Sequence, residues 1–312
     1  GVARGAMAGA RMHADEVPID AGLVRRLLAA QFPQWAELPL APVPSAGTDH
    51  AIFRLGDDKA VRLPRIHWAT GQAAKERAWL PRLAPHLPLR HPEPLAAGVP
   101  AAGYPYPWAV YRWLPGAPAS SAPLADPRRA ALDLARFIVV LQRIDPAGGP
   151  PVAEHNLRGA PLVTRDAATR AAIAAMGDMG MIDAGLATRV WEAALGVPAW
   201  ARGPVWFHGD LLPGNLLVVD GRLSAVIDWG GLGVGDPACD LFCAWALFDG
   251  DSRAAFRAAL GADEATWARA RGLALSQAVI FVPYYLHTNP AGVAGATRTI
   301  AAVLADYRRE AG

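Results

Sequence analysis

The sequence predicts an α+β protein of two lobes, with an antiparallel sheet in the N-terminal lobe and a mainly helical C-terminal lobe. Three observations lead to this prediction. Short β-branched and apolar runs separated by tight turns fill the first third of the chain, whereas Ala- and Leu-rich stretches with helical spacing follow. The 312 residues also exceed a typical single domain. We therefore expect a flexible tail over residues 1–16, an N-terminal lobe over residues 17–113 and a C-terminal lobe over residues 114–312.

Composition and charge narrow the class of protein. Hydrophobic residues make up 53% of the chain, which is enough for sizeable cores, and a net charge of +2 argues neither for nucleic acid nor for an anionic membrane. Residues 1–16 lack the apolar core of a signal peptide, and no apolar run is long enough to span a membrane. Cys239 and Cys243 are expected as small buried residues. These features predict a cytoplasmic protein without nucleic-acid or membrane partners, and they leave its oligomeric state open.

The N-terminal lobe should begin with a helix and continue as a sheet. Apolar residues recur at helical spacing over residues 20–31, with Asp20 as the N-cap. A second helix starts at Ala73, and its apolar face includes Leu80 and Leu83. Strands are expected over residues 40–45, 51–55, 60–63, 95–98 and 108–113. Pro115-Gly116 then marks the boundary between the lobes.

The C-terminal lobe should be built from helices. Asp236 and Pro237 read as an N-cap followed by the first helical residue, which predicts one helix through Phe248. Pro283 is expected to end the helix predicted over residues 264–282. The other helices are expected over residues 127–143, 164–175, 184–195, 252–260, 264–282 and 293–309.

A predicted hairpin in this lobe has polar residues at its open end. Residues 216–219 and 223–227 are short apolar runs joined by Asp220-Gly221, which is a strong hairpin signal. Asn215 and Asp228 should therefore face one another where the hairpin opens.

A third polar residue, Asp210, lies five positions before Asn215 on a loop punctuated by Gly and Pro. Two carboxylates and an amide then converge, and these oxygen ligands suit Mg²⁺ far better than zinc. Each residue alone could be a turn former or, for Asp228, a strand-end cap. Their order matches the catalytic-loop pattern of kinases, in which a base Asp and a metal-binding Asn precede a metal-binding Asp.

These motifs resemble the aminoglycoside phosphotransferase family. The resemblance is carried by His208-Gly209-Asp210 with Asn215, by Ile227-Asp228-Trp229 and by the run over residues 235–241, and it extends from about Ser45 to the C-terminal helices. It implies a protein-kinase-like fold and a Mg²⁺-dependent transfer of phosphate from ATP or GTP to a small molecule. It does not identify the substrate.

The resemblance also implies roles for residues of the C-terminal lobe. Asp210 would be the catalytic base, and Asn215 and Asp228 would bind Mg²⁺. Asp240 would support the catalytic loop through a contact with His208, and neither of these two residues would transfer a proton.

In the N-terminal lobe, Arg62 stands where the kinase pattern has a strand lysine. A guanidinium can hold phosphate oxygens with a bidentate fork. Glu76 falls where the kinase helix carries the glutamate that pairs with the strand cation. The alternatives are a solvated strand arginine and a charged helix surface.

Two further N-terminal segments would bind the nucleotide. The turn that contains Gly47 and Thr48 takes the place of the glycine-rich loop, although it holds a single glycine. Backbone groups from Arg112 to Leu114 would bond the edge of the purine, at the hinge between the lobes.

The segment before the catalytic loop and the C-terminal helices would form the acceptor pocket. Polar residues of this segment are Glu154, His155, Asn156, Arg158, Arg165 and Asp166. Their mixed charges do not describe a cation-binding wall, and a solvated role is favoured for any one of them. Tyr284 and Tyr285 could stack on a sugar or line the core.

Three functions remain open. The acceptor is an antibiotic of the aminoglycoside or macrolide type, or a small metabolite such as a sugar, choline or homoserine. In the third alternative the protein is a catalytically inactive nucleotide-binding scaffold, against which the retention of Asp210, Asn215 and Asp228 argues.

Overall fold

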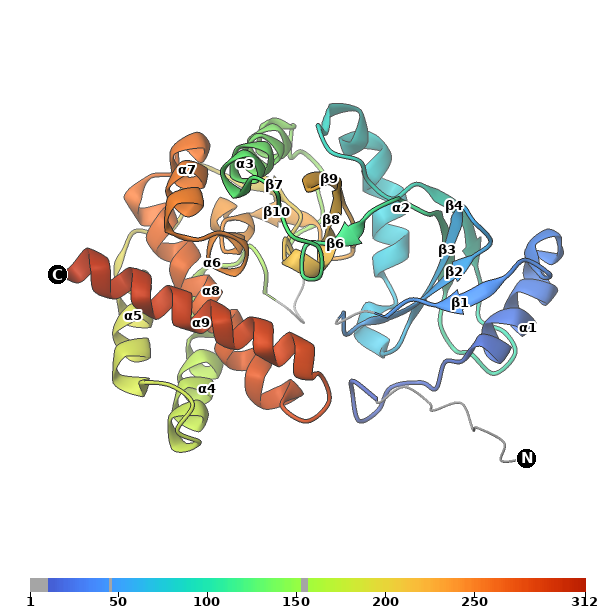
Figure 1. Ribbon diagram of the computed structural model, residues 1–312, viewed down its shortest axis with the longest axis horizontal. Helices are drawn as coiled ribbons and strands as arrows, with labels where there is room; N and C mark the ends of the chain where they lie inside the picture. The colour runs from blue at the N-terminus through green and yellow to red at the C-terminus, as the bar shows by residue number, and fades with distance from the viewer. Residues whose placement is uncertain (1–10, 45–46, 153–156) are drawn as a thin grey trace.

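The computed structural model describes residues 11–44, 47–152 and 157–312, and it has the two predicted lobes (Figure 1). The N-terminal lobe holds a five-stranded antiparallel sheet in the order β1-β2-β3-β5-β4. Its strands are β1 (Leu40–Pro42), β2 (His50–Leu55), β3 (Lys59–Pro64), β4 (Pro94–Gly98) and β5 (Trp108–Arg112). Helix α1 (Ala21–Gln31) covers the outer end of the sheet, and α2 (Gln72–Leu83) lies between the sheet and the second lobe.

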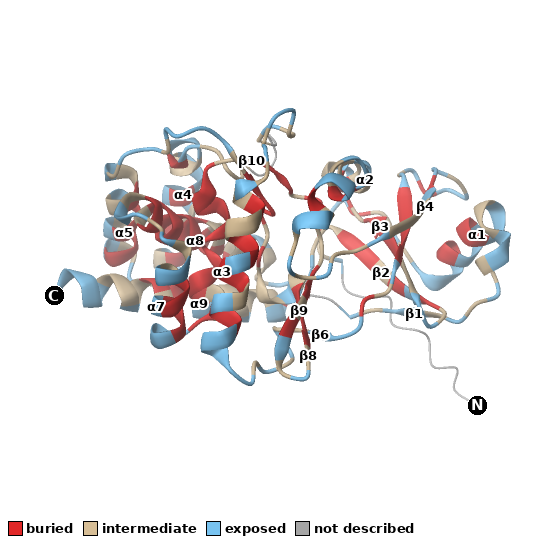
Figure 2. Ribbon diagram, turned by 90° about the horizontal axis from the view of Figure 1, so that it is seen from above, coloured by how far each residue is buried: buried red, intermediate tan, exposed pale blue. Residues whose placement is uncertain are grey.

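The second lobe is mainly helical, as predicted. Its helices are α3 (Pro127–Arg143), α4 (Asp166–Asp178), α5 (Ala184–Gly196), α6 (Cys243–Leu247), α7 (Gly250–Leu260), α8 (Glu264–Tyr285) and α9 (Pro290–Ala311). Helix α8 packs against α4, α5 and α9, and Figure 2 shows buried residues gathered around it. Among the residues that the structure describes, no helix is long and apolar enough to cross a membrane.

Two small sheets in this lobe carry the polar motifs. Strand β7 (Val205–Phe207) pairs with β10 (Gly233–Gly235), and β8 (Leu216–Val219) pairs with β9 (Arg222–Val226) and β6 (Ala117–Pro118). The predicted hairpin is therefore confirmed. Its turn residues Asp220 and Gly221 have φ angles of 50° and 76°, which a type I′ turn requires at both central positions.

The lobes have separate cores, and α2 connects them. One apolar cluster joins α1 to the sheet through residues such as Leu27 and Val61. The larger cluster fills the helical lobe and also includes Leu80 and Leu83 of α2. Burial of these two leucines holds α2 against the helical lobe, so the polar face of α2 looks into the junction between the lobes. The exact residue bounds of the two lobes stay a prediction.

Some predicted helix boundaries are wrong. The helix expected through Phe248 is instead a 3₁₀ turn (Pro237–Asp240) followed by the short α6. The two cysteines are buried as predicted, with Cys239 in the turn and Cys243 in α6. Pro283 does not interrupt a helix, because it lies in the last turn of α8, where few backbone bonds remain to be lost.

The described part of the predicted tail, residues 11–16, packs across the junction between the lobes. His13 is 2% exposed, and its ring contacts the backbone oxygen of Thr48 in one lobe and the hydroxyl of Tyr284 in the other, at 2.9 and 3.0 Å. The Thr288 hydroxyl donates to the backbone oxygen of Met12. Contacts so distant in the sequence left no local signal.

Candidate active site

The three polar residues of the hairpin motif meet in the structure. The backbone N–H of Ile227 donates to the backbone oxygen of Asn215 at 2.9 Å, which places Asp228 beside Asn215. The Asn215 amide donates to Oδ2 and to the backbone oxygen of Asp210, at 3.0 and 2.9 Å. Because its nitrogen is used in this way, the amide oxygen of Asn215 is the atom left to act as a ligand.

Asp240 bonds the backbone of the loop that leads to Asp210. Its two carboxylate oxygens accept the N–H groups of His208 and Gly209 at 2.7 and 2.8 Å. Burial raises the pKa of Asp240 to about 6, although both backbone bonds favour the charged form. Asp240 thus contacts the residue that the sequence analysis named, and its role as a support remains a prediction.

The ring of His208 has a defined orientation. Nε2 lies 2.9 Å from the backbone oxygen of Ile227, and Nδ1 lies 3.0 Å from the backbone nitrogen of Asp210. A carbonyl can only accept and an N–H can only donate, so the proton resides on Nε2 and the ring is neutral. Burial lowers the pKa of His208, which agrees with this assignment.

Two residues of the site have left-handed backbone conformations. Gly209 has a φ of +90°, which glycine adopts readily, and a Cβ there would lie 2.9 Å from the backbone oxygen of Gly231. Asp228 has a φ of 59° without being glycine. This conformation of a non-glycine residue costs roughly 1–3 kcal/mol and persists only where the surroundings impose it, as at functional sites.

Arg62 and Glu76 form a buried ion pair in the N-terminal lobe. Nη1 of Arg62 donates to Oε1 of Glu76 at 2.7 Å, and the Tyr111 hydroxyl donates to Oε2 at 2.5 Å. Nη2 of Arg62 donates to Oδ1 of Asp228, in the other lobe. Burial opposes the charge of Arg62, but Asp228 and Glu76 outweigh it and raise the pKa of Arg62. Arg62 therefore stays charged, and it links the two halves of the cleft.

Helix α2 contacts the loop after Asp228 directly. Lys75 Nζ donates to the backbone oxygen of Leu232 at 3.0 Å. A Cβ at Gly230 would lie 2.0 Å from Oε1 of Gln72, so only glycine fits beneath that side chain. These contacts fix the distance between α2 and the loop that carries Asp228.

The Gly47–Thr48 turn lies over the cleft and contacts the second lobe. The Thr48 side chain bonds that of Tyr285, and its backbone oxygen contacts His13. The aromatic rings of His13, Tyr284 and Tyr285 pack together. The two tyrosines thus line the junction between the lobes.

The hinge residues make contacts within the protein, and their predicted contact with a purine stays a prediction. The backbone N–H groups of Arg112 and Trp113 donate to the backbone oxygens of Glu93 and Asp58, at 2.9 and 2.8 Å. Leu114 belongs to a small apolar cluster with Leu217 and Ala225, separate from both main cores.

The oxygen donors at the hairpin fit a hard cation. Mg²⁺ in proteins usually takes one or two carboxylates and completes its shell with phosphate oxygens and water. Asp228 and the amide oxygen of Asn215 offer such a pair. Burial raises the pKa of Asp228, but Arg62 outweighs it and lowers that pKa, so the carboxylate is ionised as a cation ligand must be. No cluster of three or more His, Cys, Asp or Glu ligands occurs within the described ranges, as zinc would require.

Asp210 has one oxygen held by Asn215 and one in contact with Arg158. Oδ2 accepts from Asn215, whereas Oδ1 is buried and accepts no aligned hydrogen bond from the described residues. Nη1 of Arg158 lies 2.9 Å from Oδ1, and this guanidinium donates to the backbone oxygen of Gly209. Arg158 is thus the group that occupies Oδ1 at rest. An acceptor hydroxyl must reach this oxygen for Asp210 to accept its proton.

Arg158 was not singled out by the sequence analysis. It was expected to be solvated, but its guanidinium contacts the candidate base, and Asp210 raises the pKa of Arg158 against the effect of burial. Of the other polar residues in that segment, Arg165 donates to Ser276 and Asp166 contacts Arg170. Glu154, His155 and Asn156 lie outside the described residues.

Comparison with known proteins bears on the family and the fold of the chain. A family model described as the phosphotransferase enzyme family matches residues 41–273. No curated protein matches the chain in sequence.

Several solved structures are similar over nearly the whole chain. The GDP and kanamycin complex of APH(2")-IIia has a TM-score of 0.70 and 20% identity, covering 91% of this chain and 98% of that chain. Macrolide 2'-phosphotransferase MphH from Brachybacterium faecium has a TM-score of 0.59 and 25% identity, with coverages of 91% and 98%. Macrolide 2'-phosphotransferase type I has a TM-score of 0.62 and 20% identity, with coverages of 90% and 96%. The fold predicted from the motifs is thereby confirmed.

Proposed function

Because the chain belongs to the phosphotransferase enzyme family, we propose that it transfers the γ-phosphate of ATP or GTP to a hydroxyl of a small molecule. The observation that carries this proposal is the carboxylate of Asp210, which the Asn215 amide holds at Oδ2 and the Arg158 guanidinium contacts at Oδ1. An antibiotic of the aminoglycoside or macrolide type is the favoured acceptor, since similar structures include a kanamycin complex and macrolide 2'-phosphotransferases.

In the proposed reaction, Oδ1 of Asp210 orients the acceptor hydroxyl and accepts its proton. A bond forms between the acceptor oxygen and the γ-phosphorus, the bond from that phosphorus to the bridging oxygen breaks, and a nucleoside diphosphate leaves. The Asn215 amide fixes Oδ2, so the carboxylate cannot rotate away from the hydroxyl. Positioning and charge supply most of the rate enhancement in such reactions.

The N-terminal half of the site holds the nucleotide. Arg62 offsets phosphate charge, and Glu76 and Tyr111 keep its guanidinium in place. Asn215 and Asp228 would hold Mg²⁺, which would neutralise charge on the phosphates when bound. The Gly47–Thr48 turn would approach the phosphates with its backbone, and the apolar cluster at Leu114 would take the purine.

A phosphate-transfer assay tests the proposal. We expect Mg-ATP or Mg-GTP to raise the melting temperature, because a ligand that binds only the native state stabilises it. Labelled γ-phosphate should then pass to an acceptor in a panel of kanamycin, a macrolide, choline, homoserine and a sugar. Asp210→Asn should bind nucleotide with unchanged affinity and lose turnover on the order of 10² to 10⁴ fold. Unchanged turnover in this variant would contradict the assignment of the base.

The same panel separates the alternatives. Transfer to choline, homoserine or a sugar, with none to the antibiotics, would identify a small-metabolite kinase. Nucleotide binding with neither transfer nor hydrolysis would identify an inactive scaffold. The paired, charged state of Arg62 and the carboxylate of Asp210 held by Asn215 both argue against that last alternative.

A further inference from the structure

The transfer step needs a positive charge that the catalytic loop itself does not contain. Residues 208–215 include no Lys or Arg, and neither do residues 227–232. Asp210 and Asp228 both place negative charge where a phosphoryl group would pass, and Arg62 is already paired with Glu76 and Asp228. Mg²⁺ held by Asn215 and Asp228 would neutralise charge on the nucleotide side, whereas the charge of Asp210 on the acceptor side still requires compensation by a nearby cation.

Resting on the function proposed above, we propose that Arg158 is the cation of the transfer step. Its guanidinium moves away from Oδ1 of Asp210, which the incoming hydroxyl then reaches, and it binds the transferring phosphoryl group. Its guanidinium lies 2.9 Å from that oxygen and also contacts the backbone of Gly209. It therefore covers the one atom that an acceptor must reach.

The geometry of the contact suits a movable cover. The guanidinium contacts Oδ1 of Asp210 and donates to the backbone oxygen of Gly209, and the Arg158 side chain is 22% exposed. A short displacement exchanges one anionic partner, the carboxylate, for another, the phosphoryl oxygens, and the fork of arginine suits phosphate.

The charge of Arg158 reaches both halves of the cleft. Its positive charge works to lower the pKa of Lys75 of α2 and those of Asp228 and Asp240 of the helical lobe. Asp49, next to the Gly47–Thr48 turn, works to raise the pKa of Arg158. The guanidinium is thus central among the ionised groups of the site. A cation in this position can follow charge as it moves from the nucleotide to the acceptor.

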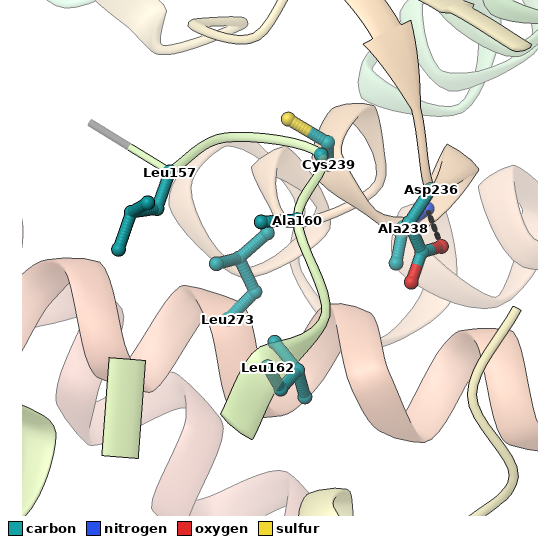
Figure 3. A pocket seen from close by; sticks show the side chains of 8 residues that line it. Leu157, Ala160, Leu162, Asp236, Ala238, Cys239 and Leu273 are labelled. Carbon is teal, nitrogen blue, oxygen red and sulfur yellow. Dashed lines mark hydrogen bonds between the residues drawn. The ribbon is translucent and has the colours of Figure 1, made fainter. Parts of the chain in front are cut away.

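The backbone around Arg158 is fixed, although its side chain is partly open. Gly159 has a φ of +75°, and a Cβ there would lie 2.3 Å from the ring of Phe207. The backbone N–H of Asp236 donates to the oxygen of Gly159 at 2.9 Å. Figure 3 shows the segment from Leu157 to Leu162 against Asp236, Cys239 and Leu273, around a cavity of about 10 Å³.

Room for the guanidinium is provided on the opposite wall by a glycine. A Cβ at Gly231 would lie 3.7 Å from Nη1 of Arg158, so the guanidinium packs directly over this residue. A large side chain at position 231 would occupy the same space. The fixed backbone and the small opposing residue together place a cation at the base.

The test uses hydrolysis of Mg-ATP or Mg-GTP by the full chain, with water as acceptor, so no antibiotic need be identified. Arg158→Gln should lower kcat roughly 10² to 10³ fold, the loss usual for one group that stabilises transition-state charge, with KM for the nucleotide unchanged. The kcat of Arg158→Lys should lie between those of Arg158→Gln and the wild type, because lysine keeps the charge but loses the bidentate fork of the guanidinium. Millimolar guanidinium should restore part of the activity of Arg158→Ala. Arg170→Gln is the matched control, since that arginine pairs with Asp166 and Glu192 on the surface of α4, and its kcat should equal that of the wild type.

Two results would overturn the inference. One is turnover by Arg158→Gln close to that of the wild type. The other is an equal loss in the Gln and Lys variants, without recovery of Arg158→Ala by guanidinium, because a residue that only braces Gly209 would behave in that way. An inactive wild type would instead count against the proposed function. An active wild type, with Asp210→Asn inactive and Arg158→Gln active, would count against this inference alone.

Discussion

Arg62 of the N-terminal lobe and Asp210 of the helical lobe are both predicted site residues, yet they are positioned by different means. Arg62 is fixed by the charged side chains of Glu76 and Asp228, and Tyr111 holds Glu76 in turn. The backbone beside Asp210 is held by Asp240 through the N–H groups of His208 and Gly209, and the carboxylate of Asp210 contacts Asn215 and Arg158.

This difference follows from what each half must do. A cation that binds phosphate can already be paired with carboxylates before the nucleotide binds, because the phosphate adds to these ionic contacts. A base must give one oxygen to the incoming hydroxyl, so bonds to that oxygen cannot be what positions it. The backbone bonds of Asp240 and the Asn215 bond to Oδ2 can hold Asp210 without using Oδ1. Changes of charge should therefore disable the first half, and changes of backbone the second.

The largest effect is expected from Glu76→Gln. This change removes the charge of a fully buried residue and leaves Arg62 short of a partner, which should lower the free energy of unfolding by about 3–5 kcal/mol. Affinity for Mg-nucleotide should fall at the same time, because the guanidinium is no longer held. Chemical denaturation and titration calorimetry measure the two effects.

Glu93→Gln is the matched control for that change. Glu93 pairs with Arg112 at 2.8 Å, which is a separation similar to that of the buried pair, but both side chains are exposed. Surface pairs contribute little, so the free energy of unfolding should be unchanged. Equal effects of the two variants would contradict the contrast between a buried charge network and a solvated pair.

The next effect tests the backbone of the other half. Gly209→Ala should lower the free energy of unfolding on the order of 2–5 kcal/mol, from the strain of its positive φ together with the clash with the oxygen of Gly231. Turnover should be lost with it. Gly203 has the same φ of +90° and nothing within 4 Å of a Cβ, so Gly203→Ala carries the strain alone and should keep full turnover. Equal free energies of unfolding and equal turnover for Gly209→Ala and Gly203→Ala would show that the clash with the oxygen of Gly231 has no influence.

The smallest effect is expected from Tyr111→Phe. The hydroxyl donates to Oε2 of Glu76 at 2.5 Å, and its loss leaves that buried oxygen without this donor. A decrease in the free energy of unfolding of about 1–3 kcal/mol follows, below that of Glu76→Gln because Glu76 keeps its charge. Nucleotide affinity should fall only slightly in calorimetry. A loss of affinity as large as that of Glu76→Gln would contradict the account of Tyr111 as a support for Glu76.

The parts of the site that the sequence predicted depend on local signals. Asp220-Gly221 determines the hairpin turn, and the hairpin brings Asn215 and Asp228 together without information from the rest of the chain. The pairing of Arg62 with Glu76 could be predicted because each stands at a fixed place in a motif. The helical lobe could be predicted because its apolar residues have helical spacing.

The parts that escaped prediction depend on contacts between distant segments. Arg158 lies in a segment without periodicity, and it reaches Gly209, 51 residues further along the chain. His13 contacts Tyr284, 271 residues away, so a stretch without pattern proves to be packed. Gly159 and Gly235 give the nearest sequence signal for Arg158, but glycines in a loop have many causes.

Nucleotide binding is assigned to Arg62 and the transfer step to Asp210. This assignment is tested most directly by measuring nucleotide affinity and single-turnover γ-phosphate release on the same samples of Arg62→Lys and Asp210→Asn. Arg62→Lys keeps the charge but loses the fork, so it should weaken Mg-nucleotide binding and keep most of the release rate once the site is saturated. Asp210→Asn should bind as the wild type does and release phosphate on the order of 10² to 10⁴ fold more slowly. Parallel losses of affinity and rate in both variants would contradict the account.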